Sequence, residues 1–440
     1  MRGKTFPVGG IHPPHFKEAT EKKNVKPAQI PAKVVLPLQQ HIGAPCEPLV
    51  AVGDTVKVGQ KIADSKGFVS APIHASISGK VVAIEPRPHP NGTNVMSIVI
   101  EGDGENNIWE GVKPYGNYKE LSPDELRKIF REAGLVGLGG ATFPTHVKIT
   151  PPEGKKVETV ILNGAECEPY LTADHRLMVE HPEDVVEGLR ILMHVLGVEK
   201  GYIGVENNKE DAIEALKNVV GDDTSIEVVS CEVKYPQGAE KQLIKTILDR
   251  EVPSGGLPLD VGVVVNNVGT AATAANILKT GMPLIERIVT ITGSGVKDPQ
   301  NLMVRLGTMF SDVIDQCGGF EGKPGKIIMG GPMMGLAQHN VDIPVIKGTS
   351  GILVFNAKEA KKYAPTTCIR CARCVDACPM SLMPATIANY ALKDLIDVSE
   401  EYDALDCIEC GCCSYVCPAK LPLVHAIRYA KAEIAARRRK

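Results

Sequence analysis

A duplicated run of cysteines near the C-terminus constrains the fold of this chain most. Each run has the spacing Cys-x2-Cys-x2-Cys-x3-Cys-Pro; the first begins at Cys368 and the second at Cys407. The chain holds 13 cysteines, and its first residues lack the apolar stretch of a secretory signal, so we expect no export. In a chain that is not exported, clustered cysteines favour metal binding over disulfides.

The spacing within each run predicts two 4Fe-4S clusters. In this ferredoxin pattern three closely spaced thiolates bind one cluster, and the fourth cysteine binds the other cluster. Zinc also binds Cys-x2-Cys pairs, but a tetrahedral ion does not require three short intervals and a Cys-Pro in one run. Cys412 has no counterpart in the first run and is expected not to bind metal. We expect one cluster on Cys368, Cys371, Cys374 and Cys417, and the other on Cys407, Cys410, Cys413 and Cys378.

Residues 384–395, between the two runs, have helical periodicity. We therefore predict a helical ferredoxin domain with two 4Fe-4S clusters over residues 366–440. Clusters move single electrons and form no covalent bond of their own, so another group has to supply or accept the electrons.

Charge and hydropathy exclude other classes of protein. The net charge is −3 and the isoelectric point about 6.4, so the basic surface of a nucleic-acid-binding protein is not expected. No apolar stretch reaches the length of a membrane span. We expect the protein to have no transmembrane segment and to associate with a membrane only through partners.

The first third of the chain predicts an arm and a β module. Residues 1–30 are rich in Pro, Lys, His and Gly, which indicates an extended arm. Residues 31–117 contain short apolar runs broken by glycine, a pattern of small all-β domains. These runs resemble biotinyl/lipoyl-type barrels, but the hairpin that carries the prosthetic group is missing. We expect this barrel to be structural.

The middle of the chain predicts an α/β domain followed by a smaller module. In residues 118–285, strand-like runs alternate with stretches that have helical periodicity, which predicts a largely parallel sheet. The strand-like runs are 160–162, 202–205, 226–229 and 261–265. Ligands of such sheets bind beyond the carboxyl ends of the strands. Residues 286–340 resemble a β-grasp module of the SLBB type, and 341–365 are expected to be a linker.

Four segments of the α/β region carry the residues of a cofactor site. A glycine-rich loop ends in Lys148, and glycines let backbone N–H groups approach a phosphate. The other three segments, 163–170, 235–240 and 266–270, supply acids, amides and a helix N-terminus. Each segment alone is weak evidence, because acid pairs and Asn-Asn turns are usually solvated loops.

In this order, and followed by the cluster domain, the segments resemble the flavin-bearing, NADH-oxidising subunit of respiratory complex I. The whole chain resembles the C subunits of Rnf complexes, membrane-bound ion-translocating ferredoxin:NAD oxidoreductases. The resemblance implies electron transfer between NAD(H), FMN and the two clusters. It implies a peripheral place on the cytoplasmic face of the membrane, with the membrane subunits and ferredoxin-like cluster subunits of Rnf as partners.

The resemblance also implies the roles of individual residues. Phe143 and Glu168 would face the nicotinamide nucleotide at the catalytic centre. FMN would be lined by Gly137, Gly139, Gly140, Lys148, Asn163, Glu166, Tyr235, Gly238, Glu240, Asn266, Asn267 and Thr270.

Two rival interpretations remain at this point. One is a cobalamin-reducing flavoprotein of propanediol microcompartments, which has similar flavin and cluster parts. The other is a non-enzymatic electron-wiring subunit whose flavin pocket has decayed. Lys148, Glu168 and the Asn266-Asn267 pair, all present, argue against the second.

Overall fold

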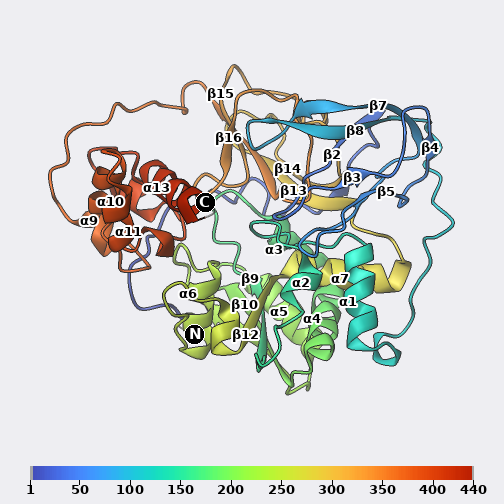
Figure 1. Cartoon of the computed structure of the whole chain (residues 1–440), viewed down its shortest axis with the longest axis horizontal. Coiled ribbons are helices and arrows are strands. Elements are labelled where there is room, and N and C mark those ends of the chain that lie inside the picture. The colour runs from blue at the N-terminus through green and yellow to red at the C-terminus, as the bar shows by residue number, and fades with distance from the viewer. Residues whose placement is uncertain (1–2, 439–440) are drawn as a thin grey trace.

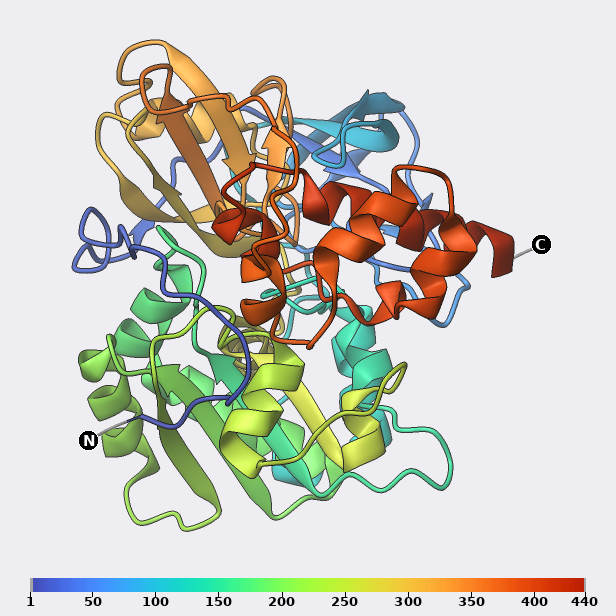
Figure 2. The same cartoon turned by 90° about the vertical axis from the view of Figure 1, so that its left-hand side faces the viewer.

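A computed structural model describes residues 3–438 (Figure 1). An α/β domain forms one side of the molecule, and the N-terminal barrel and the SLBB sheet form the other side. The C-terminal helical domain lies at the level where these two sides meet, as the turned view in Figure 2 also shows.

The α/β domain is built on a four-stranded parallel sheet with the order β11-β10-β9-β12. Its strands are almost completely buried because helices cover both faces, which accounts for their continuous apolar sequence. The strands are β9 (Thr159–Gly164), β10 (Lys200–Glu206), β11 (Ile226–Cys231) and β12 (Val263–Asn267). The helices are α1 (Pro123–Glu132), α2 (Thr145–Lys148), α3 (Ala173–Glu180), α4 (Pro182–Leu196), α5 (Glu210–Val220), α6 (Glu240–Leu248) and α7 (Val268–Thr280).

The N-terminal barrel consists of two small antiparallel sheets, β2-β8-β7-β4 and β3-β5-β6. Their strands are β2 (Lys33–Pro37), β3 (Glu47–Pro48), β4 (Thr55–Val56), β5 (Lys61–Asp64), β6 (Ile73–His74), β7 (Gly79–Pro88) and β8 (Asn94–Gly102).

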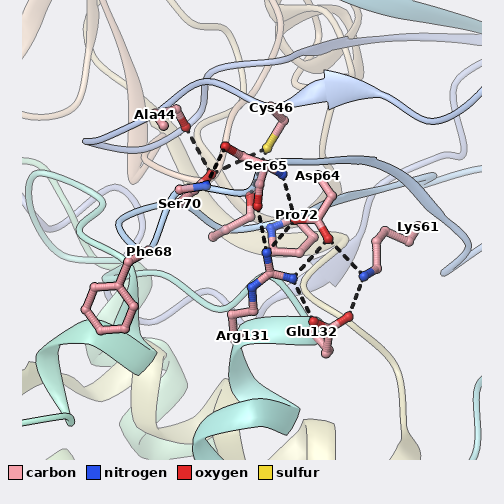
Figure 3. Close-up of polar contacts among 12 residues, drawn as sticks. Ala44, Cys46, Lys61, Asp64, Ser65, Phe68, Ser70, Pro72, Arg131 and Glu132 are labelled. Atoms are coloured by element: carbon pink, nitrogen blue, oxygen red, sulfur yellow. Dashed lines mark hydrogen bonds and ion pairs between the residues drawn. The ribbon is translucent and has the colours of Figure 1, made fainter.

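A charged network fixes the barrel against α1. The guanidinium of Arg131 points from α1 onto both carboxylate oxygens of Asp64, at 2.8 and 2.9 Å, and onto the carbonyl of Ser65 (Figure 3). Lys61 bonds Asp64 at 3.1 Å and also pairs with Glu132. A two-oxygen contact of this kind fixes orientation as well as distance.

The SLBB sheet has six strands in the order β1-β14-β13-β17-β15-β16 and is accompanied by helix α8 (Phe310–Gln316). Strand β17 lies in the stretch 341–365, which the sequence predicts to be a linker; here the structure differs from the prediction. Ile352, Leu353 and Val354 of β17 are fully buried, but such a short apolar run between polar segments has no period from which a strand can be recognised. The strands are β1 (Lys26–Pro27), β13 (Glu286–Thr292), β14 (Gln300–Arg305), β15 (Pro324–Met329), β16 (Leu336–Gln338) and β17 (Gly351–Asn356).

The C-terminal domain is helical, as predicted. Residues 384–395 form a helix and a break rather than one helix, since Asp394 adopts a left-handed backbone with φ 56°. Within residues 3–438 no helix is both long and apolar enough to cross a membrane. The helices are α9 (Arg373–Asp376), α10 (Pro384–Ala391), α11 (Ile396–Glu401), α12 (Cys412–Val416) and α13 (Leu423–Arg438).

The N-terminal arm passes across three of these parts before it enters the barrel (Figure 2). Lys4 adds a bridge to the end of β11. The N–H of Gly10 donates to the carbonyl of Ala377 in the helical domain at 3.0 Å. Residues 26–27 then pair with β14 of the SLBB sheet. The fold class predicted from the sequence is therefore confirmed, and the arm lies on the surface where its parts meet.

Candidate flavin and iron-sulfur site

Two cavities of the helical domain are lined by the two cysteine sets. One is lined by Cys378 together with Cys407, Cys410 and Cys413, and also by Cys412. The other is lined by Cys417 together with Cys368, Cys371 and Cys374. The structure thus brings together the crossed sets that the spacing predicts. No three His, Cys, Asp or Glu side chains of residues 3–438 converge on a point suited to a single metal ion.

The two sets differ in exposure. Cys378, Cys410 and Cys413 of one set are buried, whereas Cys368 and Cys371 of the other are exposed. Burial raises the pKa of the Cys413 thiol to about 12 and that of Cys407 to about 11. Buried thiols of this kind ionise when a metal replaces the proton, so Cys407 and Cys413 suit a bound cluster. A hydrogen bond with Cys412 instead lowers the pKa of the Cys410 thiol.

The glycine-rich loop lies against the N-terminus of α7. A bond from the Gly137 N–H to the Phe143 carbonyl, 2.9 Å, closes the loop, and the Leu138 N–H donates to the Thr270 hydroxyl at 2.9 Å. Gly139 lies so close to Asn267 that a Cβ there would come within 2.6 Å of its amide. Gly140 is exposed with open space on its side-chain side. A phosphate-binding loop requires backbone N–H groups that no side chain covers, and the glycines at 139 and 140 provide them.

Polar groups behind this loop form a connected set at the sheet edge. Asn267 accepts the Gly269 N–H at 2.8 Å and donates to Asp174 at 2.6 Å. The Glu166 carboxylate accepts the N–H groups of Asp174 and His175, at 2.8 and 3.1 Å. Burial, and secondly the charge of Glu166, raises the pKa of Asp174 to about 7.

One hydrogen-bond donor at this sheet edge has no acceptor among the described residues. The amide nitrogen of Asn266 is buried and has no hydrogen-bond partner among the described residues. Such a group costs free energy unless a ligand satisfies it. With the bare loop at Gly139 and Gly140, it fits the binding of a phosphate-bearing polar cofactor such as FMN.

The segment 235–240, which leads into α6, closes the same site. Asn163 donates to the carbonyl of Gly238 at 2.7 Å. Lys148 at the end of α2 forms an ion pair with Glu240 at 3.3 Å. The segments singled out in the sequence are therefore neighbours in the structure.

Glu168 and Tyr235 point toward other parts of the molecule. The Glu168 carboxylate accepts the backbone N–H groups of Met333 (3.0 Å) and Met334 (2.7 Å) from the SLBB module, and burial raises its pKa to about 7. The Tyr235 hydroxyl donates to the carbonyl of Cys410 at 2.7 Å, so its side chain reaches the cysteine domain. Phe143 is partly buried at the end of the glycine loop.

An apolar cluster joins the flavin loops to the buried cysteine set. Cys167, whose sulfur accepts the Gly238 N–H at 3.3 Å, packs there with Tyr235, Met333, Cys410 and Cys412. Sequence reasoning missed Cys167, Met333 and Asp174 as parts of this site. Cys167 lies within the segment 163–170, but the residue pattern gives it no role, and Asp174 lies outside every segment singled out in the sequence. Met333 joins the site only because the SLBB module packs against the α/β domain.

Comparisons with known proteins identify four domains along the chain, in the order in which the fold shows them. Residues 4–105 match the family described as RnfC barrel sandwich hybrid domain. Residues 130–276 match the Nuo51 FMN-binding domain, 288–337 the SLBB domain, and 360–418 the 4Fe-4S dicluster domain.

The chain is 56% identical over 432 residues to the C subunit of the Na⁺-translocating ferredoxin:NAD⁺ oxidoreductase complex of Acetobacterium woodii, covering 98% of both chains. This chain belongs to the RnfC family. The proton-translocating counterpart of Clostridium ljungdahlii is 54% identical, with 97% of this chain and 93% of the relative covered.

A solved structure resembles this RnfC protein in fold only. The air-oxidised NAD⁺-reducing [NiFe]-hydrogenase matches 73% of this chain and 62% of its own chain, with 17% identity and a TM-score of 0.50. The recognition and cofactor predictions are thus confirmed at the level of domains, while the individual ligand and contact residues stay predictions.

Proposed function

We propose that this RnfC protein is the electron-transfer subunit of a membrane-bound, ion-translocating ferredoxin:NAD oxidoreductase. It passes electrons between NAD(H), FMN and two 4Fe-4S clusters. The observation that carries the proposal is the contact between the flavin loops and the buried cysteine set, made by Tyr235 and Cys410. Bound FMN supplies the exchange between the two-electron chemistry of NADH and the one-electron chemistry of clusters.

The residues of the chain have to bind and orient the reactants. The backbone at Gly139 and Gly140, with Lys148, would hold the phosphate, and Asn266 would donate its unpaired N–H to the flavin. Glu168 has carboxylate lone pairs beyond the two used by Met333 and Met334, so it can still accept ribose hydroxyls. Phe143, at the end of the glycine loop, would contact the nicotinamide nucleotide.

The difference in exposure of the two cysteine sets supports an order of transfer. The set with Cys378 lies next to the flavin loops, so it would exchange electrons with FMN. The set with Cys417 opens to the surface through Cys368 and Cys371, so it would exchange electrons with a partner. Exposed Ile369 and Arg370 line that cavity and would offer an apolar and basic surface to the partner subunits.

The relatives' names place their proteins in multisubunit complexes, so we propose the same setting here. The partners would be the membrane subunits and the ferredoxin-like cluster subunits of Rnf. The protein would then lie on the cytoplasmic face of the membrane, held there by these subunits.

Anaerobic purification with joint measurement of iron, sulfide and flavin tests the proposal. We expect about eight irons and one non-covalent FMN per chain, with NADH:ferricyanide activity. Zinc instead of iron, or absence of flavin from protein with intact clusters, would refute it. Reduction of cob(III)alamin faster than of ferricyanide would favour the cobalamin-reducing alternative.

A further inference from the structure

The N-terminal arm contacts the flavin site at two places: Ile11 pairs with Tyr235 in a β-bridge, and residues 15–20 contact the loop 165–171 and the start of α3. This loop follows β9 and presents Glu166 and Glu168. Glu166 and Tyr170 have left-handed backbones, with φ 47° and 70°. Residues other than glycine hold such conformations only where their surroundings impose them.

Lys17 of the arm imposes this shape on the loop. Its side chain is 3% exposed, and its ammonium donates to the carbonyls of Glu166 and Glu168, each at 3.0 Å, and to that of Leu171. An ammonium has three donors, and all three are used on carbonyls of one loop. Three carbonyl dipoles converge there only because a cation lies between them.

Neighbouring residues of the arm follow the same loop. The carbonyl of His15 accepts the Tyr170 N–H at 2.8 Å, and the ring of Phe16 stacks on that of Tyr170 at 4.9 Å. The hydroxyl of Thr20 lies 2.7 Å from that of Thr172. The arm therefore forms a template for the loop over several residues, with Lys17 at its centre.

Burial of the Lys17 ammonium costs free energy, because the charge loses its hydration. It lowers the pKa of the ammonium, although the charge of Glu166 partly opposes this effect. A methionine of similar length would leave the three loop carbonyls without a donor, so the buried charge is retained only together with the loop shape that brings these carbonyls to it.

We propose that Lys17 is a positioning residue of the nucleotide site, which fixes loop 165–171 and thereby the carboxylate of Glu168. This inference rests on the proposed function. It adds the N-terminal arm to the site, which the glycine loop, the sheet edge and the SLBB module otherwise form. In this series of contacts Lys17 acts on the loop, and Glu168 is the residue that would touch the nucleotide itself.

The test compares Lys17→Met with Lys22→Met, which changes an exposed lysine of the same arm. In Lys17→Met, amide hydrogen exchange of residues 165–172 should quicken. The KM for NADH in the ferricyanide assay should rise about tenfold, because the loss of charge-assisted hydrogen bonds releases the loop. The kcat should stay within about twofold, and Lys22→Met should match the wild type in every measurement.

A double variant separates positioning from general damage. If Lys17 acts through Glu168, adding Glu168→Gln to Lys17→Met should raise the KM little beyond the larger single effect. Additive effects, an unchanged exchange rate, or an unchanged KM in protein that keeps its clusters would overturn the proposal.

A second variant covers the case in which Lys17→Met does not fold. Phe16→Ala removes a ring that is 47% exposed, and it disturbs the same loop without emptying a buried site. Exchange of residues 165–172 should quicken there too, and an unchanged rate would overturn the proposal. If the wild type oxidises no NADH, the proposed function fails, and hydrogen exchange still decides whether Lys17 holds the loop.

Discussion

The Glu168 carboxylate lies between two segments that are far apart in the sequence, its own loop and the turn at Met333. We predict that Glu168→Gln raises the KM for NADH about ten- to a hundredfold, since one hydrogen bond to a charged group contributes roughly 1.5 to 3 kcal/mol. FMN and iron content should not change. Steady-state NADH:ferricyanide rates measure the effect, with exposed Glu153→Gln as the control. Loss of flavin at an unchanged KM would contradict this role.

Asp174 gives a pH-dependent contribution to stability. Burial raises its pKa to about 7 in the folded protein, so the native state keeps a proton that the unfolded chain releases at lower pH. The stability of the wild type should therefore fall as the pH rises from about 4, where an unfolded Asp ionises, to about 7, and level off above that. In Asp174→Asn the side chain cannot ionise, so this fall in stability should be absent.

Thermal unfolding of the two proteins, at about pH 5.5 and about pH 8 with excess FMN, measures this contribution. The unfolding temperature of Asp174→Asn relative to the wild type should increase by about 2–4 °C for each kcal/mol gained at the higher pH. A difference that does not depend on pH would show that the Asp174 carboxyl has an ordinary pKa in the native protein.

At the scale of elements, the N-terminal arm lies against the buried cysteine set at Gly9. Its φ is +66°, and a Cβ there would lie 2.4 Å from the backbone carbonyl of Cys378. We predict that Gly9→Ala displaces the Cys378 loop and weakens the signal of that cluster, while the other cluster is kept. Gly104→Ala has a similar φ, +79°, and open space around it, so it is the matched control for backbone strain alone.

Anaerobic EPR spectra of reduced protein, with iron counted in the same samples, measure the effect of Gly9→Ala. Equal spectra for both variants would mean that the close approach of the arm is not needed for the cluster.

The elements also show what the sequence could and could not predict. The parallel sheet, the glycine loop and the α7 N-terminus at Asn267 were predictable, because period and capping chemistry are local. Strand β17 was not predictable, because its few apolar residues form a strand only through pairing with β13 and β15, which lie earlier in the sequence. The buried position of Lys17 was not predictable either, because a lysine in an extended arm is normally solvated. Its three acceptors lie about 150 positions away in the sequence.

At the scale of the whole molecule, the parts form a path from the flavin loops to an exposed surface. The α/β domain and the SLBB module meet at Glu168, and both touch the cysteine domain near Cys410 and Gly411. The cavity with Cys378 lies at this junction, and the cavity with Cys417 lies on the exposed side of the same domain. Electrons from NADH should therefore reach the clusters in this order.

Two serine substitutions test the order and the crossed ligand sets together. Cys378 comes from the first run but lies in the cavity of the second, and Cys417 the reverse. We predict that Cys378→Ser damages the cluster nearest the flavin, so that NADH no longer reduces the outer cluster. Cys417→Ser should damage the outer cluster and leave NADH reduction of the inner one intact. EPR after NADH, compared with EPR after dithionite, distinguishes a missing cluster from one that is present but disconnected. If Cys417→Ser instead removes the inner signal, each run keeps its own four ligands and the crossed ligand sets derived from the two cavities are wrong.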